Sequence, residues 1–269
     1  MKNNCFRRST MFIISFLIIH ILFNPVIISS AEEYHEPIGI YGDGYFEDPF
    51  FEIRNEIDGN GSPSNPYVIE GWTICLTSRI LNGISIKNLS SYIIIKNITI
   101  IREYDYYSDT LRTLSVPGFF ACGIRLVNVS NVTIENCRII NNENGIILQN
   151  CTNIKIFHND IINSFLYQAY DDNGNQNSWD NGYPSGGNYW SDYKWEDEYS
   201  GPEQDIDGSD GIGDRPYYID YDDSWDNYPL MEEYNSEEKS DWMVVILIIG
   251  VTFLIASALI IYFTKKRNR

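Results

Sequence analysis

Apolar and polar residues alternate in the same order in three stretches in the middle of the chain. The stretches begin at Gly83, Gly123 and Gly145 and read GISIKNLSSYIIIKNITI, GIRLVNVSNVTIENCRI and GIILQNCTNIKIFHNDI. Each starts with Gly-Ile-x-aliphatic-x-Asn, turns at a short polar corner and continues as a second aliphatic strand. The last two units are 22 residues apart, and segment 67–74 (YVIEGWTI) matches the second half of a unit. Short alternating strands at a fixed spacing, with Asn and Gly at the corners, predict a β-solenoid.

One such unit cannot bury its apolar side alone, so we expect successive coils to stack on one another. The expected interior ladders place Ile124 over Ile146, Leu126 over Leu148, Val129 over Cys151 and Ile134 over Ile156. Cys137 and Asn159 share a further rung at a corner, where the Asn159 amide should bond the backbone of a neighbouring coil. An ordinary β-sandwich is the alternative, but it does not explain the fixed 22-residue spacing.

The polar positions of the repeat should face solvent. The outward set is Lys87, Arg125, Glu135, Lys155 and Asp160, with Glu135 stacked over Phe157 and matched by Lys96 in the earlier coil. His158, which matches Asn136 in the repeat, should also be a solvated side chain on the outer face. A polysaccharide-cleaving site needs two or three ionisable groups converging on one face. This set does not provide them, so no catalytic residue is predicted.

Two long apolar runs lie at the ends of the chain. The first follows a basic start and is followed by Ser29-Ser30-Ala31, the small residues typical of a signal-peptide cleavage site. We expect cleavage after Ala31, with an uncleaved anchor as the alternative. The second run, 242–263, has 22 residues without a charge, enough to cross a bilayer as a helix. Because a basic tail (264–269) follows it, the C-terminus should be cytoplasmic and residues 32–241 extracellular.

The expected extracellular part is strongly acidic. Residues 32–241 hold all 37 Asp and Glu side chains of the protein but only 12 of its Lys and Arg, a net charge of −25. Residues 170–241 alone hold 21 acids and three bases. This charge makes nucleic acid and anionic lipid poor partners and favours cations or a basic partner. The expected partners are the membrane, through the single-pass anchor, and a cell-surface glycan or protein.

The charge is most concentrated in DIDGSDGIGD, residues 205–214, which holds four aspartates and three glycines. Asp205, Asp207, Asp210 and Asp214 alternate with glycines in a pattern close to the D-x-D-x-D-G calcium loop, in which glycine permits the sharp turn. One extra residue between Asp207 and Asp210 excludes the helix-loop-helix version. We expect these four side chains to share one Ca²⁺, and a solvated acidic turn is the alternative.

Cysteine and histidine are sparse in the expected extracellular part. Its cysteines are Cys75, Cys122, Cys137 and Cys151, and their spacing fits no zinc pattern and assigns no disulfide. Buried thiols and a single bridge both remain open. Copper prefers His, Met and Cys ligands. The two extracellular histidines and Met231 form no cluster in the sequence, so copper is not expected.

The repeats have distinctive neighbours: NPYVIEGWTI precedes them, and NSWDNGYPSGGNYWSDY, DGIGDRPYYID and DNYPLM follow. Together these segments resemble the NosD-like right-handed parallel β-helix proteins, which belong to the wider pectin-lyase-like group and include many archaeal surface proteins. The resemblance covers about residues 60–231. It implies an all-β fold, a short right-handed parallel β-helix of about four to five coils.

The resemblance and the apolar runs together divide the chain into seven parts. These are a signal peptide (1–31), an N-terminal cap (32–66), the β-helix repeats (67–165), an acidic, aromatic C-terminal cap (166–233), a linker (234–241), a transmembrane helix (242–263) and a basic cytoplasmic tail (264–269).

The C-terminal cap and the repeats contain two further kinds of candidate site. Tyr189, Trp190, Tyr193 and Trp195 would suit stacking on sugar rings, but a solenoid end must be covered, and capping is the favoured role. Six N-x-S/T sequons would be open to glycosylation in an exported region, although the one at Asn60 is disfavoured by Pro63. The other five are at Asn88, Asn97, Asn128, Asn131 and Asn150.

The sequence therefore predicts a membrane-tethered extracellular β-helix with a structural, adhesive or glycan- or partner-binding role and no catalysis of its own. The alternative is a carbohydrate-active enzyme of the pectin-lyase-like fold: a polysaccharide hydrolase, lyase or epimerase. Two or three carboxylates within about 6 Å in an open groove would favour the enzyme.

Overall fold

The structure is a computed structural model, and it describes residues 34–47, 56–77, 81–103, 121–173, 176–221 and 223–235. The signal segment and the transmembrane run expected at 242–263 lie outside these ranges. Within them, no helix has the length and apolar character needed to span a membrane.

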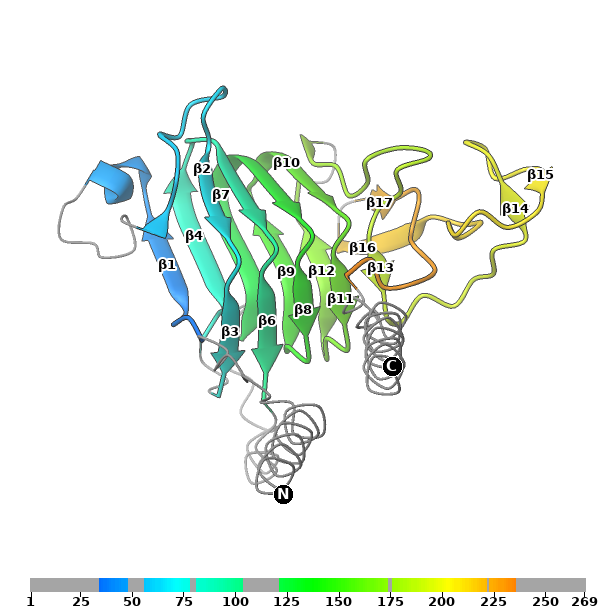
Figure 1. Cartoon of the computed structure of the whole chain (residues 1–269), viewed down its shortest axis with the longest axis horizontal. Coiled ribbons are helices and arrows are strands. Elements are labelled where there is room, and N and C mark those ends of the chain that lie inside the picture. The colour runs from blue at the N-terminus through cyan, green and yellow to red at the C-terminus, as the bar shows by residue number, and fades with distance from the viewer. Residues whose placement is uncertain are drawn as a thin grey trace, which may run out of the picture. The chain divides into compact units, whose positions relative to one another are not determined.

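Parallel strands build the fold, and Figure 1 shows them side by side from β1 to β12. The first ladder contains β1 (Ile38–Tyr41), β4 (Ile84–Leu89), the first half of β7 (Cys122–Glu135), β9 (Asn144–Gln149), β12 (Tyr167–Asp171) and β16 (Tyr217–Tyr221). The second contains β2 (Tyr67–Glu70), β5 (Ile93–Lys96), the second half of β7 and β10 (Thr152–Phe157). The third contains β3 (Thr73–Leu76), β6 (Thr99–Arg102), β8 (Arg138–Ile140), β11 (Asp160–Ile162) and β13 (Tyr189–Trp190).

A few short elements lie outside the three parallel ladders. Strand β17 (Ser224–Asp226) pairs antiparallel with β16, and β14 (Tyr199–Ser200) pairs antiparallel with β15 (Ile206–Asp207). A 3-10 turn, η1 (Asp43–Glu47), follows β1. The chain thus runs through one strand of each ladder per coil as far as β13, and after β13 only β16 returns to a ladder.

The strand register places the repeat as predicted. Ile124 pairs with Ile146, Leu126 with Leu148 and Ile134 with Ile156. All of these side chains are fully buried. The outward pairing of Glu135 with Phe157 is confirmed as well. The coil stack is longer than the predicted range 67–165, because β1 joins it before that range and β12 and β13 join it after.

The glycine that opens each repeat is required by the closeness of two ladders. A Cβ at Gly123 would lie 2.4 Å from Cγ2 of Ile139 and 2.9 Å from the carbonyl oxygen of Gly145. A Cβ at Gly83 would lie 2.6 Å from Cγ2 of Ile100. The interior isoleucines of the third ladder therefore occupy the space that a side chain would need, and only glycine fits.

The asparagines that end the repeat's first strand hold a left-handed backbone and stack on one another. Asn88, Asn128 and Asn150 have φ between 52° and 55°, a region that Asn tolerates better than other non-glycine residues. Nδ2 of Asn128 donates to Oδ1 of Asn88 at 3.0 Å, and Nδ2 of Asn150 donates to Oδ1 of Asn128 at 2.7 Å. The corner asparagines thus form a ladder of hydrogen-bonded side-chain amides along the stack.

Candidate functional site

A buried carboxylate closes the C-terminal end of the stack. Asp226 is fully buried, and its Oδ2 accepts hydrogen bonds from the backbone N–H of Asn188 at 2.7 Å and from the indole N–H of Trp190 at 2.9 Å. Its Oδ1 accepts the N–H of Tyr228 at 3.1 Å. A Cβ on Gly187 would lie 1.9 Å from that oxygen. The GGNYW and DNYP motifs therefore meet at the last coil. Gly187, Asn188, Trp190 and Asp226 are called the closure here.

The charge of Asp226 is costly in this position. Burial raises the pKa of this carboxyl to about 7, although the N–H donors around it act in the opposite direction. A second buried carboxylate, that of Asp171, is hydrogen-bonded to residues near this closure. It accepts the indole N–H of Trp179 at 3.2 Å and the hydroxyl of Ser224 at 3.1 Å.

The asparagine rung predicted at Asn159 is present and continues into the closure. Oδ1 of Asn159 accepts the backbone N–H of Cys137 at 2.9 Å, and its Nδ2 donates to the carbonyl of Ile134 at 2.9 Å. The expectation that this amide bonds the backbone of a neighbouring coil is confirmed. Asn188 extends the rung, because its Oδ1 accepts from Asn159 Nδ2 at 2.9 Å and its Nδ2 donates to the carbonyl of Ile156 at 3.0 Å.

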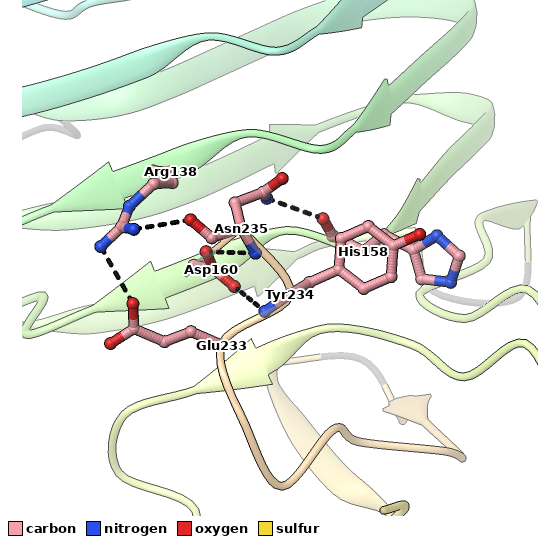
Figure 2. A network of polar contacts seen from close by, with 6 residues as sticks. All are labelled: Arg138, His158, Asp160, Glu233, Tyr234 and Asn235. Atoms are coloured by element: carbon pink, nitrogen blue, oxygen red, sulfur yellow. Dashed lines mark hydrogen bonds and ion pairs between the residues drawn. The ribbon is translucent and has the colours of Figure 1, made fainter. Parts of the chain in front are cut away.

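Residues 233–235, here called the strap, cross the outer face of β8 and β11 (Figure 2). The carboxylate of Asp160 accepts the N–H of Tyr234 at 2.7 Å and the N–H of Asn235 at 3.0 Å. Arg138 donates to Oε2 of Glu233 at 2.9 Å and to the carbonyl of Asn235 at 2.7 Å. The strap thus provides hydrogen-bond partners for Asp160 and Arg138, the two ionisable side chains that pair across β8 and β11.

The strap corrects three expectations. Asp160 faces outward in the ladder but is fully buried rather than solvated, because the strap covers it. Burial raises its pKa to about 6, and this outweighs the two N–H donors and Arg138. His158 is half-buried and not solvated, since its ring stacks on Tyr234 at 4.0 Å between centroids. The first residues of the predicted linker 234–241 are therefore ordered parts of the cap.

His158 also meets a hydroxyl, but the pair does not form a nucleophile and base. Its Nε2 lies 2.8 Å from the carbonyl oxygen of Ser185 and 3.2 Å from Oγ of the same residue. The carbonyl can only accept, so Nε2 carries the proton and donates to it. A protonated Nε2 cannot take the Ser185 hydroxyl proton. His158 is therefore a positioning group for the strap and the 181–186 turn.

The four predicted calcium ligands do not converge. Asp205 and Asp207 are exposed. The carboxylate of Asp214 accepts the N–H groups of Glu198 and Tyr199, each at 3.0 Å, and that of Asp210 accepts the N–H of Ile212 at 3.1 Å. Across the described ranges, no group of three or more His, Cys, Asp or Glu side chains is arranged to hold a metal ion. Backbone N–H donors thus stabilise two of the four carboxylates of this loop.

The aromatic residues proposed for glycan stacking differ in exposure. Trp190 is 1% exposed and its ring stacks on Tyr217 at 4.2 Å between centroids, a position that suits the favoured capping role. Tyr189 and Tyr193 are half-buried. Trp195 is 52% exposed, but the guanidinium of Arg215 lies over its ring at 4.1 Å from the centroid. The exposed face of Trp195 is what remains for a ligand.

A second acidic group lies beside this aromatic stack. The hydroxyl of Tyr217 donates to Oδ1 of Asp192 at 3.0 Å, and Nε2 of Gln168 donates to the same oxygen at 3.3 Å. Burial, and then the charge of Asp192, raise the pKa of the Asp220 carboxyl. This is a pair of interacting carboxylates at the end of the first ladder, and the outward positions of the repeat did not reveal it.

The four cysteines within the described ranges are thiols. Cys75, Cys122, Cys137 and Cys151 are all free, and the last three are buried. Burial raises the pKa of Cys122 and Cys137 to about 12 and that of Cys151 to about 11. These buried thiols behave as small apolar side chains, which decides between the two readings left open by the sequence.

One shallow groove follows the asparagine ladder. It has a volume of about 380 Å³ and is lined by Asp43, the three ladder asparagines, and the neighbouring Leu89, Ser90, Val129, Ser130 and Thr152. Asp43 accepts bonds from the N–H and hydroxyl groups of Ser90 and Ser91, at 2.6 to 3.3 Å. The polar groups of the groove therefore largely satisfy one another.

Comparison with known families agrees with the ladder arrangement. A family model described as a right handed beta helix region matches residues 32–182. The chain belongs to the right-handed β-helix family. The right-handed β-helix match ends before the GGNYW motif, so the closure and the strap lie beyond it. No curated protein and no solved structure matches the chain significantly.

Proposed function

We propose that this chain is a membrane-tethered, extracellular β-helix module of the NosD-like type with a structural or adhesive role. The signal-like run and the apolar run 242–263 support an extracellular coil stack that is anchored at its C-terminal side. The net charge of −25 over residues 32–241 keeps such modules soluble and favours cationic or basic surface partners.

The observation that carries this proposal is that the residues of the C-terminal motifs close the end of the coil stack. Gly187, Asn188, Trp190 and Asp226 come from the segments that look most like functional motifs. In the fold they close the last coil around a buried carboxylate. Residues consumed in closing a solenoid end support a load-resisting or binding module rather than a reaction centre.

Two measurements test the proposal. Protease added to intact cells should remove residues 32–241 and spare an epitope placed after Arg269, and a protected coil stack would contradict the orientation. The purified extracellular part should then bind a surface glycan or protein on a glycan array or in cell-adhesion assays without altering it. Release of reducing ends from the bound glycan would contradict a purely adhesive role.

The alternative is a carbohydrate-active enzyme, and Asp192 and Asp220 are the carboxylates to test first, because burial and then the charge of Asp192 raise the pKa of Asp220. A carboxyl with a raised pKa suits a general acid, and such a site needs a second carboxylate as base or nucleophile. Incubation with acidic and neutral polysaccharides, followed by reducing-end analysis, tests this. Activity that is lost in Asp220→Asn and in Asp192→Asn, with unchanged unfolding temperature, would establish the enzyme.

A further inference from the structure

The five sequons of the coil stack fall into two groups according to what their side-chain amides do. Three amide nitrogens are donors inside the stack. Nδ2 of Asn128 donates to Asn88, Nδ2 of Asn150 donates to Asn128, and Nδ2 of Asn131 donates to the carbonyl of Ser90 at 2.8 Å. Asn128 and Asn131 are also acceptors, from Asn150 and from Asn153 Nδ2 at 2.8 Å, so each lies between two neighbours.

The other two sequons belong to the second coil, where the ladder ends. Gly42 stands in register before Asn88, because its N–H donates to the carbonyl of Lys87 at 2.8 Å. Gly71 stands before Asn97, and its N–H donates to the carbonyl of Asn97 at 3.1 Å. A glycine has no side chain to stack on an asparagine. Both asparagines are exposed, and among the described residues no hydrogen bond uses Nδ2 of either one.

The two exposed asparagines differ in the rest of their sequons. Gly71, which stands before Asn97 in register, faces open space, because the position of its Cβ would have no atom within 4 Å. In the sequon of Asn88, by contrast, the hydroxyl of Ser90 already donates to Oδ2 of Asp43 at 2.8 Å. Thr99, two residues after Asn97, is half-buried, so the accessible part of that sequon is the Asn97 amide.

We propose that Asn97 is an N-glycosylation site of the folded protein, with Asn88 as a second, and that Asn128, Asn131 and Asn150 carry no glycan. This inference rests on the proposed extracellular location. The donor would be an oligosaccharide activated as a lipid-linked phosphate or pyrophosphate. Nδ2 bonds to C1 of the first sugar and loses one proton, while the C1–O bond breaks and the lipid phosphate leaves with the electron pair.

A glycan on a ladder asparagine would disrupt the ladder. Asn128 and Asn150 are themselves exposed, but Nδ2 of each donates to the asparagine of the preceding coil, and Asn128 lies between Asn88 and Asn150, so a sugar on Nδ2 would compete with these contacts. Chains modified at Asn128, Asn131 or Asn150 before folding should therefore be missing from the folded, protease-resistant population. The sugars should gather near the N-terminal end of the stack and leave the closure and the strap bare.

The test is glycopeptide mapping of the full chain, purified from the membranes of a host that glycosylates N-x-S/T. A reporter sequon in a short tag between Ala31 and Glu32 serves as the control for export. We expect glycan on the reporter and on the Asn97 peptide, with Asn88 occupied to a lesser extent. Asn97→Gln and Thr99→Ala should each remove one glycan mass, while Asn128→Gln should remove none.

Two results would overturn the inference in different ways. A modified reporter with a bare Asn97, or with glycan on Asn128, Asn131 or Asn150 in the protease-resistant protein, would contradict the site assignment and leave the location intact. A bare reporter together with bare sequons would contradict the extracellular location itself, and the glycosylation inference would fall with it.

Discussion

The indole N–H of Trp190 donates to the buried carboxylate of Asp226 at 2.9 Å, across 36 residues of sequence. This bond joins the last strand of the third ladder to β17, the antiparallel strand at the end of the first. The carboxylate belongs to the core of the closure, so the protonation of a single group should influence the stability of the whole C-terminal end.

Stability should rise when the solution is acidified. The pKa of Asp226 is about 7 and that of Asp160 about 6 in the fold, both above the ordinary value of an aspartate carboxyl. Between these values and about pH 4, the folded chain binds protons that the unfolded chain does not, so protonation favours folding. We expect urea unfolding to give a free energy roughly 2–4 kcal/mol larger near pH 5 than near pH 7.5. Asp226→Asn should flatten this dependence, and a loss of stability toward pH 5 would contradict it.

Gly187→Ala should destabilise the closure strongly. The added methyl would lie 1.9 Å from Oδ1 of Asp226, which cannot move without leaving its donors. We expect a loss of roughly 2–4 kcal/mol in thermal or urea unfolding. Gly44→Ala is the matched control, because its Cβ would meet nothing within 4 Å, and it should be near neutral. Equal effects for the two variants would contradict the packing described.

The interior ladder gives a third comparison. Ile134 is fully buried and pairs with Ile156, while Glu135 is the outward neighbour. Ile134→Asp places an unpaired charge in the core, which costs several kcal/mol and should prevent folding. Glu135→Ala should stay within about 0.5 kcal/mol of the parent protein. Circular dichroism and the unfolding midpoint measure both, and similar effects would mean that the register is wrong.

Loss of the Asp160 carboxylate should loosen the strap. Asp160→Ala removes the acceptor of both strap N–H groups, and the rest of the coil stack retains its ladders. We expect limited proteolysis to cut near residues 232–236 at least tenfold faster, with little change in the coil stack. Lys155→Ala, an exposed position on β10, is the control. An unchanged cleavage rate in Asp160→Ala would show that the strap is held by other contacts.

The calcium site stays a prediction, and the structure sharpens its test. Asp210 and Asp214 bind backbone N–H groups, so their removal would destabilise the loop with or without metal. Asp205→Asn with Asp207→Asn is therefore the informative variant. A Ca²⁺ site of the extracellular type has a Kd of roughly 10⁻⁴ to 10⁻³ M. We expect Ca²⁺, and not Mg²⁺, to raise the unfolding midpoint of the parent chain only. No shift at about ten times the weak end of that range would leave a solvated turn.

The repeat region was predictable because its signal is local and periodic. The ladder pairs Ile124–Ile146 and Ile134–Ile156 follow from a 22-residue spacing that the sequence displays directly. The Asn159 rung followed from the same spacing, since an amide at a corner has few partners other than the next coil.

The closure and the strap were not predictable in the same way. Asp160 meets the strap 74 residues further on, and Asp171 meets Ser224 across 53 residues. The strap and Ser224 lie outside any repeat. Periodicity indicates which way a residue points, but not what covers it. One signal was present, because Asp171 takes the interior position of Leu148 in the next coil. A carboxylate at an aliphatic rung indicates that the stack is about to end.

The asparagine ladder also restricts how this molecule can change length. Each corner asparagine is held by the matching asparagine one coil away, whether the coil spans 22 residues or, between Asn88 and Asn128, 40 residues. Extra residues can therefore lie in a loop between strands without breaking the ladder, whereas a longer stack needs a complete additional turn. Such a turn adds about 4.8 Å along the axis, the spacing of paired strands. The closure contacts the last coil through Asn188, so the same contacts would form at the end of a longer stack. Related proteins should therefore differ in stack length by whole numbers of coils.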